Sequence, residues 1–185
     1  MIVNKYESDC AIVRLGLNKM LEGIFTSKSS QEDLIKFLDR NKHDHYNIRD
    51  KSDPSGKFQY KLTRDEVIEN SKDYKKKFSV YESLAEADKT LILQGEIQID
   101  KDFVMMASLS DVKGISNRIA MQEPKYNIHG FDLTDKREPS IRGLSKVLDY
   151  IISKELLDVV VEFSLFEIPV GINNEDIIIW ELRNY

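Results

Sequence analysis

The C-terminal segment constrains the fold of this chain most, because apolar and polar residues alternate along it with a period of two. Residues 159–168 and 177–182 are both rich in β-branched and aromatic side chains, which favour strands. Residues 169–174 between them contain a proline, a glycine and two asparagines, which are typical of turns. The sequence therefore predicts a terminal β-hairpin.

A second hairpin is predicted earlier in the chain. Apolar residues alternate with polar ones over 91–99, a second apolar run covers 103–107, and Asp-Lys-Asp at 100–102 separates the two. This is the pattern of two strands joined by a short turn. Residues 110–139 are turn-rich and longer than a usual connection, which predicts a functional loop or a further strand.

Capping residues and helical periodicity predict four helices. Their predicted first residues are Ser8, Ser29, Thr63 and Ser140. The Ser29–Glu32 and Thr63–Glu66 pairs have the spacing of a capping box. We expect the first helix to end at Gly23 and the third to run, with an interruption, to residue 87.

The order of these elements predicts an α+β fold. N-terminal helices are followed by a mostly antiparallel sheet built from two hairpins, with a helix packed on it. The polar segment 41–56 closes on Asp-Pro-Ser-Gly, a turn sequence. We therefore expect a helical N-terminal sub-region over 1–56 and an α+β core over 57–185, or one compact domain overall.

Composition restricts the cellular setting and the partners. The single cysteine, Cys10, cannot form an intrachain disulfide, and the N-terminus lacks the apolar core of a signal peptide. The apolar run at 177–180 is far shorter than the roughly 18 residues of a membrane span. We therefore expect a cytoplasmic protein without membrane contact.

The charge of the chain is concentrated at its C-terminal end. The formal net charge is −5, and residues 155–185 hold seven acidic residues against Arg183 alone. Such a segment repels the phosphate backbone of a nucleic acid. It suits a protein partner with a basic surface.

Histidine and cysteine give weak support for a metal site. His43 and His45 lie close in sequence, and His129 with Cys10 would complete four ligands. No second closely spaced pair anchors these residues, and polar clusters between periodic segments are usually loops. The common phosphate-loop, serine-hydrolase and redox motifs are absent from the sequence.

Two carboxylates on the terminal hairpin offer the clearest chemistry. Glu162 and Glu181 each lie within a run of apolar strand residues. A carboxylate there must face solvent, pair with a cation or bind a metal, because burying it unpaired costs several kcal/mol. Together with the amide of Asn184 they would form a hard oxygen site suited to Mg²⁺.

Trp180, the only tryptophan, lies beside one of these carboxylates. Strict alternation from Ile177 places Trp180 on the same face as Ile178 and Leu182, opposite Glu181. A large indole is rarely buried completely, so we expect partial burial.

The order of elements over residues 89–184 resembles the ATP-binding half of ATP-grasp ligases. An apolar strand leads to Glu96, a loop with Arg118 and a helix follow, and two strands carry Glu162 and Glu181. The resemblance implies that Gln94, Glu96 and Arg118 contact ATP and that Glu162, Glu181 and Asn184 hold Mg²⁺. In this sequence Asn184 comes one residue later than in the family's Glu-x-Asn pattern, which moves it to the other face of a strand.

Two further interpretations compete with this one. Asp158 followed by Glu181-Leu182-Arg183 resembles the Asp…Glu-x-Lys pattern of restriction-like nucleases, but an arginine stays protonated and cannot replace the lysine as a base. The simplest interpretation is a non-catalytic binding or interaction protein that uses its acidic, aromatic C-terminal sheet. The alternative is a Mg²⁺-dependent, nucleotide-using enzyme of the ATP-grasp-like type.

Overall fold

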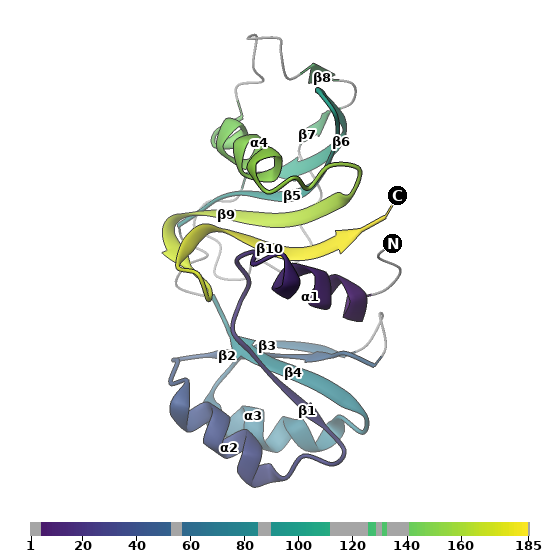
Figure 1. The fold of residues 1–185 in the computed structure, drawn as a ribbon. Coiled ribbons are helices and arrows are strands. Elements are labelled where there is room, and N and C mark those ends of the chain that lie inside the picture. The colour runs from purple at the N-terminus through teal and green to yellow at the C-terminus, as the bar shows by residue number, and fades with distance from the viewer. Residues whose placement is uncertain are drawn as a thin grey trace. The chain divides into compact units, whose positions relative to one another are not determined.

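The chain is divided into two compact units. The computed structural model describes residues 5–52, 57–84, 90–111, 126–128, 131–132 and 141–184. Unit 1 comprises Met1–Lys19 and Glu86–Tyr185, and unit 2 comprises Met20–Ala85 (Figure 1). The boundary expected at residue 56 lies outside the described residues, and the two units have other bounds than the expected sub-regions.

Unit 1 is built on an antiparallel sheet with the strand order β10-β9-β5-β6-β7, in which β8 also pairs with β6. Its elements are α1 (Lys5–Arg14), β5 (Leu91–Asp100), β6 (Phe103–Ser110), β7 (Tyr126–Ile128), β8 (Phe131–Asp132), α4 (Leu144–Ser153), β9 (Val160–Val170) and β10 (Glu175–Arg183). The β5–β6 and β9–β10 pairs confirm both predicted hairpins. The short strands β7 and β8 confirm that the long connection contains strand structure.

Unit 2 is a smaller antiparallel sheet, β1-β4-β2-β3, with helices α2 and α3 on one face (Figure 1). Its elements are β1 (Glu22–Thr26), α2 (Gln31–Arg40), β2 (Tyr46–Asp50), β3 (Phe58–Leu62), α3 (Arg64–Asn70), a 3-10 helix (Ser71–Asp73) and β4 (Lys77–Glu82). Leu34 and Leu38 of α2 pack with Ile48 and Val80 of the sheet in a separate hydrophobic core. Both units combine helices with antiparallel strands, so the α+β class is confirmed.

The first helix is shorter than predicted. It ends at Arg14, and Gly16 rather than Gly23 leaves the helical conformation, with a φ of 63°. Glu22 and Gly23, where the sequence predicts the end of the helix, instead begin β1. A Cβ at Gly23 would lie 2.8 Å from ring atoms of Phe25 and Phe37. Gly23 therefore serves close packing in a strand and not the end of a helix.

The second helix is capped one residue later than predicted. Asp33 donates its backbone N–H to the Ser30 side chain, and Ser30 returns its own N–H to the Asp33 carboxylate. This capping box replaces the predicted pair of Ser29 and Glu32. The hydrogen bonds from Ser30 hold the pKa of Asp33 below its usual value.

The third helix begins as predicted but ends early. The Thr63–Glu66 capping box is confirmed. The helix ends at Asn70, and residues 77–82, predicted as helix, form β4. Ser140, the predicted cap of the fourth helix, lies outside the described residues; that helix begins at Leu144, after Gly143 with a φ of 82°.

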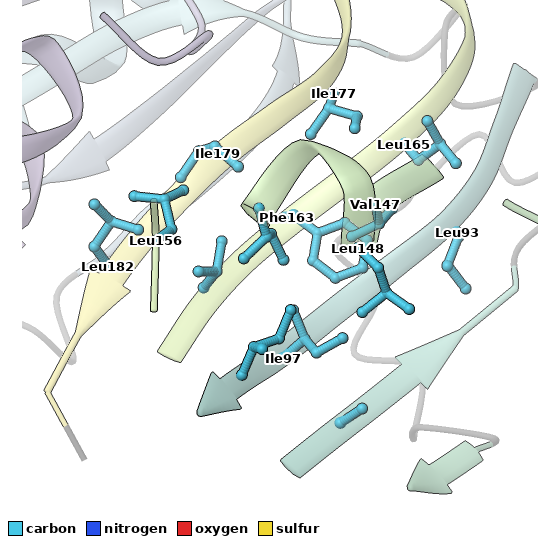
Figure 2. Packing of buried hydrophobic residues seen from close by; sticks show 14 of the residues in the cluster. Leu93, Ile97, Val147, Leu148, Leu156, Phe163, Leu165, Ile177, Ile179 and Leu182 are labelled. Atoms are coloured by element: carbon cyan, nitrogen blue, oxygen red, sulfur yellow. The ribbon is translucent and has the colours of Figure 1, made fainter. Parts of the chain in front are cut away.

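The core of unit 1 lies between its sheet and the helices α1 and α4. Figure 2 shows Val147 and Leu148 of α4 beside Phe163 and Leu165 of β9, in one cluster of buried side chains. Strand β10 contributes Ile177, Ile179 and Leu182 to the same cluster. Burying side chains of this kind contributes about 1.5–3 kcal/mol each. The terminal hairpin is therefore part of the core sheet.

Asn18 ties the chain after α1 to the turn of this hairpin. Its buried side-chain amide donates to the carbonyl oxygens of Val170 at 2.8 Å, Glu175 at 3.1 Å and Ile177 at 2.9 Å. Its Oδ1 accepts from the Asn173 N–H at 2.9 Å. These bonds satisfy backbone groups that a turn leaves unpaired.

We predict that removing residues 175–185 abolishes folding of unit 1. The truncation deletes β10, removes the four buried side chains Ile177, Ile178, Ile179 and Leu182, and exposes the edge of β9. A chain shortened by only residues 184–185 keeps β10 and should melt as the full chain does. Circular dichroism melting of the two proteins provides the test; a cooperative transition of unit 1 in the longer truncation would contradict it.

Candidate functional site

Three glutamates form a row across neighbouring strands of unit 1. Glu96 on β5 is the register partner of Glu162 on β9, and Glu162 is the partner of Glu181 on β10. Residues directly opposite each other in antiparallel strands share a face, with Cβ atoms about 4.5–5.5 Å apart. Their chain neighbours Ile97, Val161 and Leu182 are buried in the core. This carboxylate row therefore lies on the face of the sheet away from that core.

A β-bulge at Trp180 brings Glu181 into the row. Ile179 pairs with Phe163 and Glu181 with Glu162, so β10 has one residue more than β9 at this step. Beyond this extra residue, side chains that would have faced one side of the sheet face the other side. Leu182 consequently enters the core, and the prediction that Trp180 shares a face with Leu182 is wrong. The predicted partial burial of Trp180 is confirmed.

The indole of Trp180 is held on the same face as the row. Its Nε1–H donates to the Oγ of Ser164 at 2.9 Å, and Ser164 is buried. Ser164 in turn has Gln94 and Ile178 as register partners. Gln94, Ser164 and Ile178 thus form a second row across the three strands, next to the carboxylate row.

Arg183 supplies a positive charge to the carboxylate row. Its Nη2 lies 2.5 Å from Oε1 of Glu96, and its Nε lies 3.9 Å from Oε1 of Glu181. The Glu181 side chain is 15% exposed and that of Glu96 is 37% exposed. Like charges directly opposite each other destabilise a sheet, so the guanidinium offsets a repulsion that the register imposes.

The structure brings together four of the six predicted site residues. Gln94, Glu96, Glu162 and Glu181 share one face of the sheet. Asn184 follows the end of β10 and is exposed, whereas Arg183 stands two residues after Glu181 on the face of the row. Arg118 lies outside the described residues, as does His129.

Sequence reasoning missed two residues of this face and noted a third only as an obstacle. Ser164 and Ser108 sit opposite Gln94 and Glu96, but lone serines in strands carry no recognisable signal. Arg183 counted against nuclease chemistry, yet it pairs with the row itself. The signal that points to it is its position two residues after Glu181, once the bulge is known.

Among the described residues, the structure brings together no further metal site of the kinds that the sequence suggests. Within the described ranges, no group of three or more His, Cys, Asp and Glu side chains could hold a metal ion. Asp158, required by the nuclease interpretation, is exposed at a φ of 62° and lies four residues before Glu162, about 13 Å along an extended chain. The nuclease arrangement is therefore absent from this face.

The carboxylate row fits Mg²⁺ only in part. Arg183 forms its close ion pair with Glu96 and lies 3.9 Å from Glu181, and the directly opposed carboxylates on β9 and β10 are Glu162 and Glu181. Mg²⁺ in proteins is commonly bound by one or two carboxylates together with phosphate oxygens and water. The donor set is therefore suited to a metal ion that arrives with phosphates, and not to a cage made by the protein alone.

No helix in the described part of the chain is both long and apolar enough to span a membrane.

Comparison with known proteins finds similar folds among solved structures only. No protein-family model and no characterised protein matches the sequence. Among solved structures, D-alanine-D-alanine ligase from Coxiella burnetii matches with a TM-score of 0.55 at 10% identity, over 99% of this chain and 48% of the ligase. The corresponding ligase from Helicobacter pylori matches with a TM-score of 0.54 at 12% identity, over 98% and 54%.

A third match is N5-carboxyaminoimidazole synthase from Aspergillus clavatus, solved with ADP and 5-aminoimidazole ribonucleotide. Its TM-score is 0.57 at 14% identity, over 98% of this chain and 44% of the synthase. The chain thus spans about half the length of the structures it matches. All three are ATP-grasp ligases, so the chain has an ATP-grasp-like fold and the resemblance expected from the sequence is confirmed.

We predict that Ser164→Ala lowers the free energy of unfolding by about 0.5–1.5 kcal/mol, because it removes the hydrogen bond from Trp180. Ser79→Ala is a matched control. Ser79 on β4 is equally buried, but its Oγ has no hydrogen-bond partner among the described residues. Urea unfolding followed by circular dichroism should show Ser79→Ala to be neutral or stabilising. A larger loss in Ser79→Ala than in Ser164→Ala would refute this assignment.

Proposed function

We propose that this chain binds ATP together with Mg²⁺ on the face that carries the carboxylate row, as a nucleotide-using protein of the ATP-grasp-like type. The observation that carries the proposal is the direct pairing of Glu162 with Glu181 on adjacent strands. The fold likeness to ATP-grasp ligases, one of them solved with ADP, supports the nucleotide-using alternative better than a non-catalytic binding protein.

Each residue of the face has a role in this proposal. Glu162 and Glu181 would hold the metal ion, and phosphate oxygens would complete its coordination. Arg183 keeps the Glu96 carboxylate neutralised, which lowers the repulsion that the phosphates meet. Buried Ile178 and Phe166 exclude water from the same face of the sheet, beside Ser164.

Magnesium with the triphosphate would neutralise phosphate charge and polarise the bonds that are broken in phosphoryl transfer. The chain's own contribution is the fixed register of β9 and β10. It holds Glu162 and Glu181 opposite each other before any ligand arrives. Such preorganisation reduces the cost of ordering the site on binding.

The partner with a basic surface stays a prediction. Acidic residues of the C-terminal segment outside the row, such as Glu155 and Asp158, are exposed. They suit such a partner by charge complementarity.

We predict that ATP with Mg²⁺ raises the melting temperature of unit 1 and changes the fluorescence of Trp180, the only tryptophan, which adjoins Glu181. A ligand at a hundredfold excess over its Kd stabilises the folded state by about 2.7 kcal/mol. Glu181→Gln should abolish both signals, because it keeps the shape of the side chain and deletes the charge that attracts the cation. ATP with EDTA should give neither signal.

Glu167→Gln is the control for this experiment. Glu167 lies on the same strand as Glu162 but outside the row, where it pairs with Arg142 at the surface. This variant should respond to Mg²⁺ and ATP as the natural chain does. Absence of any response in the natural chain would reject the proposal, and a response that survives in Glu181→Gln would reject the role given to the carboxylates.

A further inference from the structure

The outer edge of β10 lies against the chain's own N-terminal segment, residues 5–19. β10 is the last strand of the unit 1 sheet, so the N–H and C=O groups on its outer side have no neighbouring strand to pair with. Helix α1 contacts this strand (Figure 1). Ala11, Ile12 and Leu17 of the segment belong to the same core as Leu182. The N-terminal segment is therefore placed to supply partners for the edge of β10.

Two hydrogen bonds from β10 to the N-terminal segment flank the bulge. Just before the bulge, the Ile179 N–H donates to the backbone oxygen of Asn18 at 2.9 Å. Just after it, the Leu182 N–H donates to the Oγ of Ser8 at 2.7 Å. A bulge leaves its extra residue unpaired and disrupts the ladder locally. These two bonds therefore hold β10 on both sides of the point where its pairing with β9 is interrupted.

Both residues that accept these bonds are themselves fixed. Asn18 is completely buried, and its side-chain amide donates to three carbonyl oxygens of the terminal hairpin. Ser8 is 1% exposed, and Ile12, one turn later on α1, is packed in the core of unit 1. A buried polar group that loses its partner destabilises the folded state. The two acceptors are thus rigid points to which the edge of β10 is attached.

We propose that Ser8 is a positioning residue of the carboxylate row. With the Asn18 carbonyl holding β10 before the bulge, the Ser8 hydroxyl holds it after the bulge and so keeps Glu181 opposite Glu162. Without that hydroxyl, the end of β10 opens more often from β9. The inference deepens the proposed function, on which its consequence for ATP binding rests, but the attachment of β10 is a property of the chain without nucleotide.

Hydrogen exchange measured by nuclear magnetic resonance on the full chain, without nucleotide, tests the proposal. Ser8→Ala removes the hydroxyl and leaves the rest of α1 in place. Loss of one hydrogen bond raises a local opening equilibrium by about threefold to tenfold. We expect the backbone amides of Glu181 and Arg183 and the indole N–H of Trp180 to exchange about threefold to tenfold faster, beyond any change at the amides of β9. Trp180 gives a single indole signal because it is the only tryptophan.

Ile12→Val is the matched control. Ile12 lies on the same helix and is 1% exposed, so this variant loosens the packing of α1 and keeps the Ser8 hydroxyl. It should speed exchange evenly over β9 and β10, with no excess at the end of β10. Ser8→Cys is a second variant that remains informative if Ser8→Ala does not fold. It fills the space of the serine with a weaker acceptor and should show the same excess, reduced in size.

Faster exchange that is uniform over the unit 1 sheet in the Ser8 variants would overturn the proposal, because it would show a purely structural role. Unchanged exchange at the end of β10, or an equal excess in Ile12→Val, would overturn it as well. The Kd for ATP with Mg²⁺ should rise in Ser8→Ala more than in Ile12→Val, and an equal Kd in the two variants would contradict the positioning role. A natural chain that does not respond to ATP rejects the proposed function, whereas the exchange measurements still decide on Ser8.

Discussion

The bulge at Trp180 determines which side chains of β10 lie on the face of the unit 1 sheet that carries the carboxylate row. A one-residue slip in a strand sends every later side chain to the opposite face. Before the bulge, Ile177 and Ile179 pack in the core; beyond it, Leu182 does so, which turns Glu181 and Arg183 toward Glu162 and Glu96. The Leu182 N–H donates to the buried Ser8 Oγ at 2.7 Å, so α1 fixes the strand on the far side of the bulge.

This geometry forces like charges together at a cost that the fold must offset. Two unit charges about 5 Å apart repel by about 0.8 kcal/mol in bulk water and by about 3 kcal/mol at an effective dielectric constant of 20. Because the Glu181 side chain is only 15% exposed, its repulsion with a neighbouring charge is closer to the second value than the repulsion at an open surface site would be. A chain selected for stability alone would place threonine or valine here, and local costs of this kind are typical of functional sites.

The sequence predicted the parts of the fold that local signals encode. Period-two alternation identified both hairpins of unit 1, and the Thr63–Glu66 spacing located a capping box. It failed at β1 and β4, where apolar residues recur at spacings that also suit a helix. There Phe25 and Phe78 stack across the paired strands, and such tertiary contacts override local propensity.

The candidate site was predictable in its residues but not in its geometry. The two glutamates of the terminal hairpin stand out as charges within apolar strands, yet alternation alone put Glu181 opposite Trp180. The bulge reverses this, and it also places Arg183 where the Glu-x-Asn pattern expects an oxygen ligand. An amide oxygen there would add to the attraction for a metal ion, whereas a guanidinium subtracts from it. In the proposed function, the phosphates of the nucleotide would supply the oxygen ligands that an arginine at this position does not, and metal binding would therefore depend on nucleotide binding.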